Sequence, residues 1–274
     1  MDQNTTKHLI AYFDILGYTH IVKSLSKKEE KEFLDLINNC VKTVYETFSN
    51  REYKDSYIKF NVHSFSDNFL ISMPLYPCYE IGLYCCLMFR LIREVQIGLI
   101  SGFQIFVRGA IVIDDLYVSD KFIYGRGIIK AYELENNIAI YPRIIIDSEV
   151  VSIHKEFLNK VYNQEHRTIG KIIKASSVDV AIDPNNVKKD FDGIFFINYL
   201  STTFTFRGDP YIRFNNHKIA VVENLIHYCN NIKISQKYLW CQNYHNNSLG
   251  KMAQIFPKFI ITQDDLPNQC IIDD

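Results

Sequence analysis

The chain has 274 residues, of which 47% are hydrophobic and 22% are charged, and its formal net charge is −1. These values are typical of a folded protein with one large domain, or with one domain and an appendage. They exclude an extended basic surface for nucleic acid, so we expect no nucleic-acid partner. An anionic ligand must instead be held by a local cluster of charges.

The longest apolar stretch, residues 79–106, is interrupted by Arg90, Arg93 and Glu94. It is too polar to span a bilayer, so we expect a buried helix followed by a buried strand, and no membrane contact. The 7 cysteines form no CxxC pair and no zinc spacing with histidine. That usage is typical of reduced thiols in a cytoplasmic protein, and the N-terminal residues lack the pattern of a signal peptide.

In chain order, residues 8–16 are almost wholly apolar and predict a central strand that ends at Gly17. Apolar residues then recur at helical spacing over Lys27–Phe48, which predicts an amphipathic helix. Two strands, 57–65 and 69–73, flank the turn residues Ser66-Asp67-Asn68 and predict a tight hairpin with Asp67 at its tip. We then predict a long helix from Cys78 to about Leu99, which Ser101-Gly102 would end. A strand over 103–113 follows it.

This β-α-β-β-α-β order is that of a ferredoxin-like α+β fold. In such a sheet the first strand lies antiparallel beside the third, so its C-terminal end meets the tip of the hairpin. The topology therefore predicts that Asp14 and Asp67 lie together. We assign residues 1–185 to this main domain. Residues 186–274, which include a strand near 192–200, helices over 220–232 and 235–246 and an extended tail, form an extension docked on it.

Two aspartates among apolar residues are costly to bury unless their charge is compensated. Two divalent metal ions, Mn²⁺ or Mg²⁺, would compensate it and keep coordination positions open for phosphate oxygens, as phosphoryl transfer requires. The loop formed by Phe13, Asp14, Ile15, Leu16, Gly17 and Tyr18 would hold the phosphates, since Gly17 allows a close backbone approach and a helix begins near Thr19. The ordinary alternative is that Asp14 ends a strand and Asp67 fills a turn.

The motifs FDILGY at 13–18 and FSDN at 65–68 resemble the two metal motifs of class III nucleotidyl cyclases. Further segments follow in the same order: RGAI at 108–111, YG at 124–125, AYELE at 131–135 and PR at 142–143. Over residues 8–147 the ordered set resembles the pyrimidine nucleotide cyclases of bacterial Pycsar antiphage systems. The resemblance implies a homodimer with active sites at the interface. It also implies conversion of UTP or CTP to the 3′,5′-cyclic monophosphate, which activates a separate effector protein.

By this resemblance, Asp14 and Asp67 are the metal ligands, and Ile15 offers its backbone carbonyl. The family's asparagine and arginine, which position the ribose and stabilise the transition state, correspond to Ile129 and Glu133 here. Other positively charged residues must therefore stabilise the transition state in this chain. The candidates for charge neutralisation are Arg108 and Lys130, and the candidates for substrate binding are Arg126 and Arg143. A second subunit would supply some of these cations.

The position of the lysine that reads a purine base is His63, which argues against ATP and GTP. We favour UTP over CTP. Two alternatives stay open. The first is a cyclase fold that has lost catalysis and senses a nucleotide, and the second is a purine cyclase. The hairpin sequence SFSDN differs from the GGDEF of diguanylate cyclases.

Overall fold

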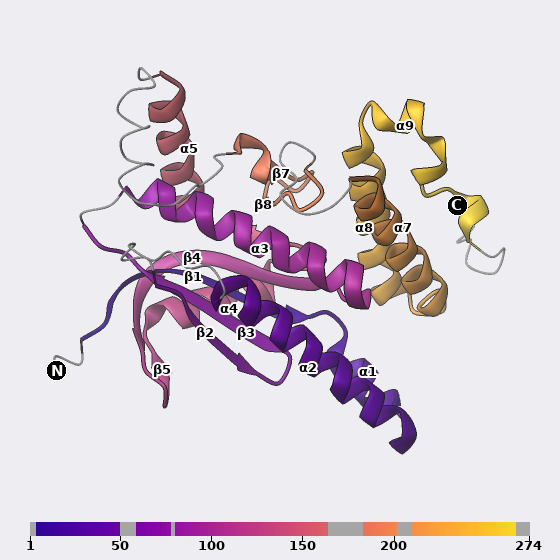
Figure 1. Ribbon diagram of the computed structural model, residues 1–274, viewed down its shortest axis with the longest axis horizontal. Helices are drawn as coiled ribbons and strands as arrows, with labels where there is room; N and C mark the ends of the chain where they lie inside the picture. Colours follow the sequence, from indigo (N-terminus) through magenta and orange to yellow (C-terminus); the bar gives the residue numbers. More distant parts are fainter. Residues whose placement is uncertain (1–3, 50–58, 78–79, 164–182, 202–209, 267–274) are drawn as a thin grey trace.

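A computed structural model describes residues 4–49, 59–77, 80–163, 183–201 and 210–266 (Figure 1). Within these residues eight strands form a mostly antiparallel sheet, accompanied by eight α-helices. The fold is therefore of the mixed α+β class, as the sequence predicted. The strand order is β2-β3-β1-β4-β6-β8-β7, and β5 pairs with β4 away from this path.

The N-terminal elements are β1 (Thr6–Ile15), α1 (Tyr18–Ser24), α2 (Lys27–Ser49), β2 (Asn61–Phe65), β3 (Asn68–Pro74), α3 (Ile81–Phe103) and β4 (Val107–Val118). The elements that follow are β5 (Ile123–Tyr124), α4 (Arg126–Asn137), β6 (Ile144–Ile146), α5 (Ser148–Asn163), β7 (Val187–Lys189), β8 (Phe195–Ile197), α7 (Pro210–His227), α8 (Ile232–Leu249) and α9 (Met252–Ile255). The predicted β-α-β-β-α-β order is present, with the short helix α1 added.

Strand β1 lies between β3 and β4 and runs antiparallel to both. Its residues alternate between two faces, because successive side chains of a strand point in opposite directions. Phe13 faces the main core with α3, and Ile10 faces a smaller core that includes Ala131 of α4. Gly109 of β4 is required at its position, since a Cβ there would come within 2.3 Å of the carbonyl oxygen of Tyr12. The two faces therefore bury β1 almost completely.

The C-terminal region joins the same sheet. Strand β6 runs parallel to β4, and β8 pairs with β6 through Ile145 and Phe196. Figure 1 shows α5 beside one end of α3 and the α7–α8 pair beside the other. The sheet thus continues across the predicted boundary between 1–185 and 186–274, so the extension is connected to the main domain by strand pairing as well as by helix packing.

The helix predicted over 220–232 lies instead at Pro210–His227, as α7, and the strand predicted over 103–113 is β4 at Val107–Val118. Two further predicted boundaries are wrong. Helix α3 does not stop at Ser101-Gly102 but continues to Phe103, where Gln104 adopts a left-handed conformation with φ of 57° and bonds back to Ile100. The tail after Phe256 is not simply extended, because Pro257–Phe259 and Gln263–Asp265 form 3₁₀ turns, the second with a capping box. Both errors concern short-range capping, which apolar periodicity does not report. The predicted loop over 50–56 lies outside the described residues.

In the described part of the chain, none of the helices combines the length and apolarity needed to cross a membrane. The cysteines at positions 40, 85, 86, 229 and 241 are free thiols, and burial raises the pKa of Cys40 to about 12.

Two buried histidines connect α7 to α8. The Nδ1 atoms of His217 and His245 are 3.0 Å apart, and their rings stack at 5.1 Å. The hydroxyl of Tyr199 lies 3.0 Å from Nε2 of His217, and His245 Nε2 bonds to the carbonyl oxygen of Phe259 at 2.8 Å. Burial lowers the pKa of His217 well below its usual range, and burial lowers the pKa of His245 to about 4. Both side chains are therefore neutral in the folded protein.

We predict that acid destabilises the protein through this pair. Below pH 6.5 the unfolded state binds a proton at His245 while the folded state does not, so the free energy of unfolding falls between pH 6.5 and about 4. For His245 alone the loss is about 3 kcal/mol. Urea unfolding across this range measures it. His245→Gln should flatten the pH dependence, whereas replacing the exposed His227 by glutamine should leave it as in the wild type. An unchanged slope in His245→Gln would refute the assignment.

Candidate functional site

The two aspartates lie at one edge of the sheet. Asp14 is opposite Asn68 on β3 and Arg108 on β4. The next residue, Ile15, donates its N–H to the carbonyl oxygen of Asp67 at 3.1 Å. Ser66, which precedes Asp67, adopts a left-handed backbone conformation with φ of 58°, so the hairpin turns tightly at this point. The antiparallel pairing of β1 therefore brings both residues to the same place.

Arg108 binds both oxygens of the Asp14 carboxylate. The Nε atom of Arg108 lies 3.1 Å from Oδ1 and 3.3 Å from Oδ2 of Asp14, and its Nη2 atom lies 3.1 Å from Oδ2. The same guanidinium forms an ion pair with Glu135 at 2.7 Å. Because its planar fork can serve two carboxylates at once, Arg108 neutralises the charge that β1 and α4 bring together.

Glu135 is the third carboxylate of the site and is almost fully buried. Burial, together with the charge of Asp14, raises the pKa of Glu135 to about 7, although Arg108 acts in the opposite direction. Burial also raises the pKa of Asp14, against the opposing effect of Arg108. Burial and the charge of Asp14 therefore favour the protonated form of Glu135 as the pH falls through neutrality.

A second chain of hydrogen bonds holds Asp67. The hydroxyl of Tyr12 donates to Oδ1 of Asn68 at 2.5 Å, and Nδ2 of Asn68 donates to Oδ1 of Asp67 at 3.0 Å. Burial and the neighbouring carboxylates raise the pKa of Tyr12 to about 12, so this hydroxyl keeps its proton. Tyr12 and Asn68 thus orient the Asp67 carboxylate.

The residues predicted to hold phosphates, 13–18, form the end of β1 and a short turn into α1. Gly17 has φ of 80° and precedes the first residue of α1, Tyr18. The N–H groups of Ile15 and Leu16 are already bonded to the carbonyl oxygens of Asp67 and Phe106. The Phe13 side chain faces the core, where it stacks on Phe69 at 5.2 Å. Of the predicted loop residues, Gly17 and Tyr18 therefore provide the backbone at the start of the helix.

His63 lines a hollow of about 390 Å³ on the face of the sheet that carries Asp14. Its lining includes Phe65, Phe122 and Ile123, and also Tyr12 and Asn68. Because the last two belong to the hydrogen-bond chain that holds Asp67, this hollow adjoins the aspartates. Its lining is mostly apolar and aromatic, as is usual for pockets that take a flat organic ring.

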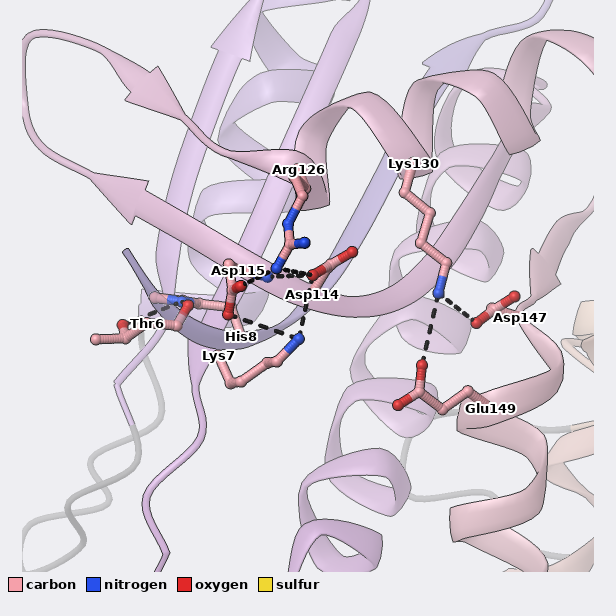
Figure 2. Close-up of polar contacts among 9 residues, drawn as sticks. All are labelled: Thr6, Lys7, His8, Asp114, Asp115, Arg126, Lys130, Asp147 and Glu149. Carbon is pink, nitrogen blue, oxygen red and sulfur yellow. Dashed lines mark hydrogen bonds and ion pairs between the residues drawn. The ribbon is translucent and has the colours of Figure 1, made fainter. Parts of the chain in front are cut away.

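The other predicted cations pair with different carboxylates. Arg126 is exposed and binds Asp115 at 2.5 Å, and Lys130 binds Asp147 at 2.7 Å, as Figure 2 shows. Arg143 is completely buried and forms ion pairs beside β7 with two aspartates, Asp190 and Asp192. Arg108 is thus the predicted cation that the fold brings to Asp14.

Lys237 of α8 is a residue that the sequence analysis missed. It is half-buried and interacts electrostatically with Arg108, Asp14 and Glu135. Burial, followed by the charge of Arg108, lowers the pKa of Lys237. Helix α8 reaches the site because the next residue, Tyr238, packs against Phe106 with ring centroids 5.6 Å apart.

Glu135 was also missed, although the sequence contained a signal for it. It lies four residues after Ala131 on α4 and so shares the inward face of that helix. Lys237 had no such signal, because its contact with the site depends on how the C-terminal region docks.

The donor set suits a hard divalent cation, since Asp14 and Asp67 offer carboxylate oxygens. Among the described residues no group of three or more His, Cys, Asp or Glu side chains is arranged to hold a metal. Arg108 binds both oxygens of Asp14, so a metal that bound these oxygens would displace Arg108 from them.

A search of protein-family models found no match to this chain, and a search of curated proteins also found none.

We predict that Arg108→Met destabilises the protein by about 3 kcal/mol, because it leaves the Asp14 and Glu135 carboxyl groups without their cation. The double variant with Glu135→Gln should lose less, since one of the two groups is then neutral. Arg126→Met is the matched control. That side chain is 74% exposed, so its loss should cost about 0.5 kcal/mol or less. Urea unfolding compares the three. A double variant no more stable than Arg108→Met would contradict the charge argument.

Proposed function

We propose that the protein is a metal-dependent pyrimidine nucleotide cyclase that converts UTP, or CTP, to the 3′,5′-cyclic monophosphate and diphosphate. The observation that carries the proposal is the meeting of Asp14 and Asp67 at one sheet edge, together with Arg108. The order of motifs that resembles class III nucleotidyl cyclases supports it. The proposed fold type is accordingly that of this superfamily.

Asp14 and Asp67 would hold two divalent ions, Mn²⁺ or Mg²⁺, and the carbonyl of Ile15 would be a further ligand. When bound, these ions supply Lewis acidity to the hydroxyl and to the phosphates. The ribose 3′ oxygen would form a bond to the α-phosphorus and pass its proton to a water molecule. The bond from the α-phosphorus to the bridging oxygen breaks, and diphosphate leaves with the electron pair.

The chain's own cations act on the charge of the triphosphate. Arg108 can exchange Asp14 for a phosphate oxygen once a metal neutralises the aspartate, and it stays anchored by Glu135 at 2.7 Å. Lys237 lies on the side of the site formed by α8 and offers a second positive charge. These two residues take the place of the asparagine and arginine that the sequence replaces by Ile129 and Glu133.

The hollow beside Asp67 is the proposed site of the base. It combines the imidazole of His63 with the side chains of Ser64 and Asn68, and the aromatic rings of Phe65 and Phe122 line it. Imidazole, hydroxyl and amide groups can each donate or accept a hydrogen bond with a pyrimidine edge. The lysine typical of purine cyclases is absent from position 63, and we favour UTP.

A second copy of the chain would complete the active site. Large apolar side chains are more than half exposed on the hairpin tip, near β5 and on α4, namely Phe65, Phe122, Tyr124, Ile129 and Tyr132. Exposed apolar residues on neighbouring elements are typical of an interface. In the cell the cyclic nucleotide would be the second messenger of an antiphage defence system and would activate a separate effector protein.

The first prediction of this proposal concerns turnover. Purified protein with Mn²⁺ should form cyclic UMP from UTP, and less product from CTP, ATP and GTP, as measured by chromatography of the nucleotides. Asp14→Asn and Asp67→Asn should each lower kcat/KM by a factor on the order of 10² or more. Asp35→Asn, an exposed aspartate on α2, is the control. Failure of the wild-type protein to cyclise any of the four nucleotides would refute the proposal.

The second prediction concerns Lys237. Lys237→Gln should lower kcat/KM for UTP about tenfold, because one positive charge near the triphosphate is lost. Lys237→Arg should retain most of the activity. Lys233→Gln, one helical turn earlier and exposed, should behave like the wild type. Thermal unfolding of each variant separates a loss of charge from a loss of folding. Full activity in Lys237→Gln would exclude this role.

A nucleotide sensor without catalysis is the second candidate function. The observation that favours it is the binding of both Asp14 oxygens by Arg108, which occupies the positions a metal would need. In that case nucleotide binding would be independent of Mn²⁺ and would survive Asp14→Asn, and no product would form.

A further inference from the structure

Arg108 occupies the oxygens of Asp14 that the proposed metal ions would need. Its Nε atom donates to both carboxylate oxygens, at 3.1 and 3.3 Å, and its Nη2 atom donates to Oδ2 at 3.1 Å. Charge-assisted bonds between a guanidinium and both oxygens of a carboxylate are among the stronger polar contacts in proteins. A cation that binds Asp14 must replace these bonds, so Arg108 lowers the affinity that Asp14 offers to a metal on its own.

Glu135 gives the same guanidinium a second partner. Its Oε1 atom lies 2.7 Å from Nη2 of Arg108, and its side chain is only 4% exposed, against 16% for Asp14. Helix α4 holds Glu135 close to the sheet, because a Cβ on Gly127 would come within 2.2 Å of Cδ1 of Ile10 on β1. Arg108 can therefore release Asp14 and still keep its ion pair with Glu135.

Arg108 also has capacity for a further anion. Its Nη1 atom forms no hydrogen bond with any residue that the structure describes, and its side chain is 22% exposed. Lys237 on α8 is half-buried and interacts electrostatically with Arg108 and with Asp14. Guanidinium and ammonium groups are the side chains that most often bind phosphate in proteins. A triphosphate would thus offer Arg108 a new partner in exchange for Asp14.

We propose that Arg108 makes the binding of metal and the binding of triphosphate mutually dependent. Without nucleotide, Arg108 stays on Asp14 and opposes the metal. With nucleotide, Arg108 bonds to a phosphate oxygen, keeps Glu135 and leaves Asp14 to the metal. This coupling rests on the proposed function, because it takes Asp14 as a metal ligand, and it adds a form of regulation, since the site gains metal only when substrate arrives.

The binding of Mn²⁺ to the full-length protein tests the coupling without turnover. Free Mn²⁺ is measured by its electron paramagnetic resonance signal, first with protein alone and then with α,β-methylene-UTP. In this analogue a P–C bond replaces the bond that cyclisation breaks. The wild type should bind Mn²⁺ at least about tenfold more tightly with the analogue, since coupling between two ligands commonly changes affinity by about 5- to 150-fold. A titration without protein accounts for the analogue's own binding of Mn²⁺.

Variants of Arg108 give the decisive comparison. Arg108→Gln should bind Mn²⁺ alone at least about tenfold more tightly than the wild type, because Asp14 then has no cation to release. The analogue should add little to that affinity. Arg108→Lys keeps the charge but not the planar fork, so its affinity for Mn²⁺ alone should lie between the two. Arg90→Gln is the matched control, since it removes an arginine from another ion pair, with Glu94 at 3.4 Å on α3.

Thermal unfolding in EDTA shows which variants are folded, and Arg108→Lys decides if Arg108→Gln is not. Affinity for Mn²⁺ alone that is no higher in the folded Arg108 variants than in the wild type would overturn the coupling, and so would a wild-type affinity that the analogue leaves unchanged. The two proposals can fail separately. A protein that shows the coupling but cyclises no nucleotide loses the proposed function only, and a cyclase whose Mn²⁺ affinity ignores Arg108 loses the coupling only.

Discussion

Strand β1 is hydrogen-bonded along both edges, to β3 and to β4, and both pairings are antiparallel. Antiparallel pairing places opposite residues side by side on the same face, so the neighbours of Asp14 are determined by register. One neighbour is Asn68, which binds Asp67, and the other is Arg108, which binds Asp14 itself. A register shift of one residue would turn Asp14 into the apolar core and remove both contacts.

Burial gives this arrangement its chemical character. The half-buried Asp14 and the buried Glu135 face one guanidinium, with Asp67 held beside them, and a half-buried lysine lies on α8. Burial, and the presence of more carboxylates than cations, raise the pKa of Asp14 and the pKa of Glu135, so the site favours an added positive charge. A divalent cation meets that requirement, and so does a proton on Glu135, whose pKa is raised to about 7.

The N-terminal half of the fold was largely predictable from residue pattern. Continuous apolar residues indicated β1, helical periodicity indicated α2, and the turn residues around Asp67 indicated the hairpin. The connection order then implied which strands are neighbours. The errors were local. Helix α3 continues through Gly102 and ends only before Gln104, which has a left-handed backbone conformation, and Pro257 starts a 3₁₀ turn in the tail. Such features depend on single caps that have little effect on periodicity.

The candidate site was only partly predictable for the same kind of reason. Asp14 and Asp67 could be paired because both lie within elements whose connectivity fixes their positions. The cations could not be assigned, because a long side chain selects its partner from whatever carboxylate the packing brings near. Three of the predicted cations form ion pairs with other aspartates, namely Arg126, Lys130 and Arg143. Lys237, which lies near Asp14, is 170 residues after Asp67 in the chain.

The amino-acid sequence by itself determined the order of strands and helices, and with it the sheet edge at which two aspartates meet. Local backbone preferences and apolar periodicity are sufficient for that, because they act between residues close in the chain. Only the tertiary structure decided which charges surround those aspartates, and that Asp14 and Glu135 share one guanidinium. Both depend on contacts between distant segments, which packing of the whole core brings together.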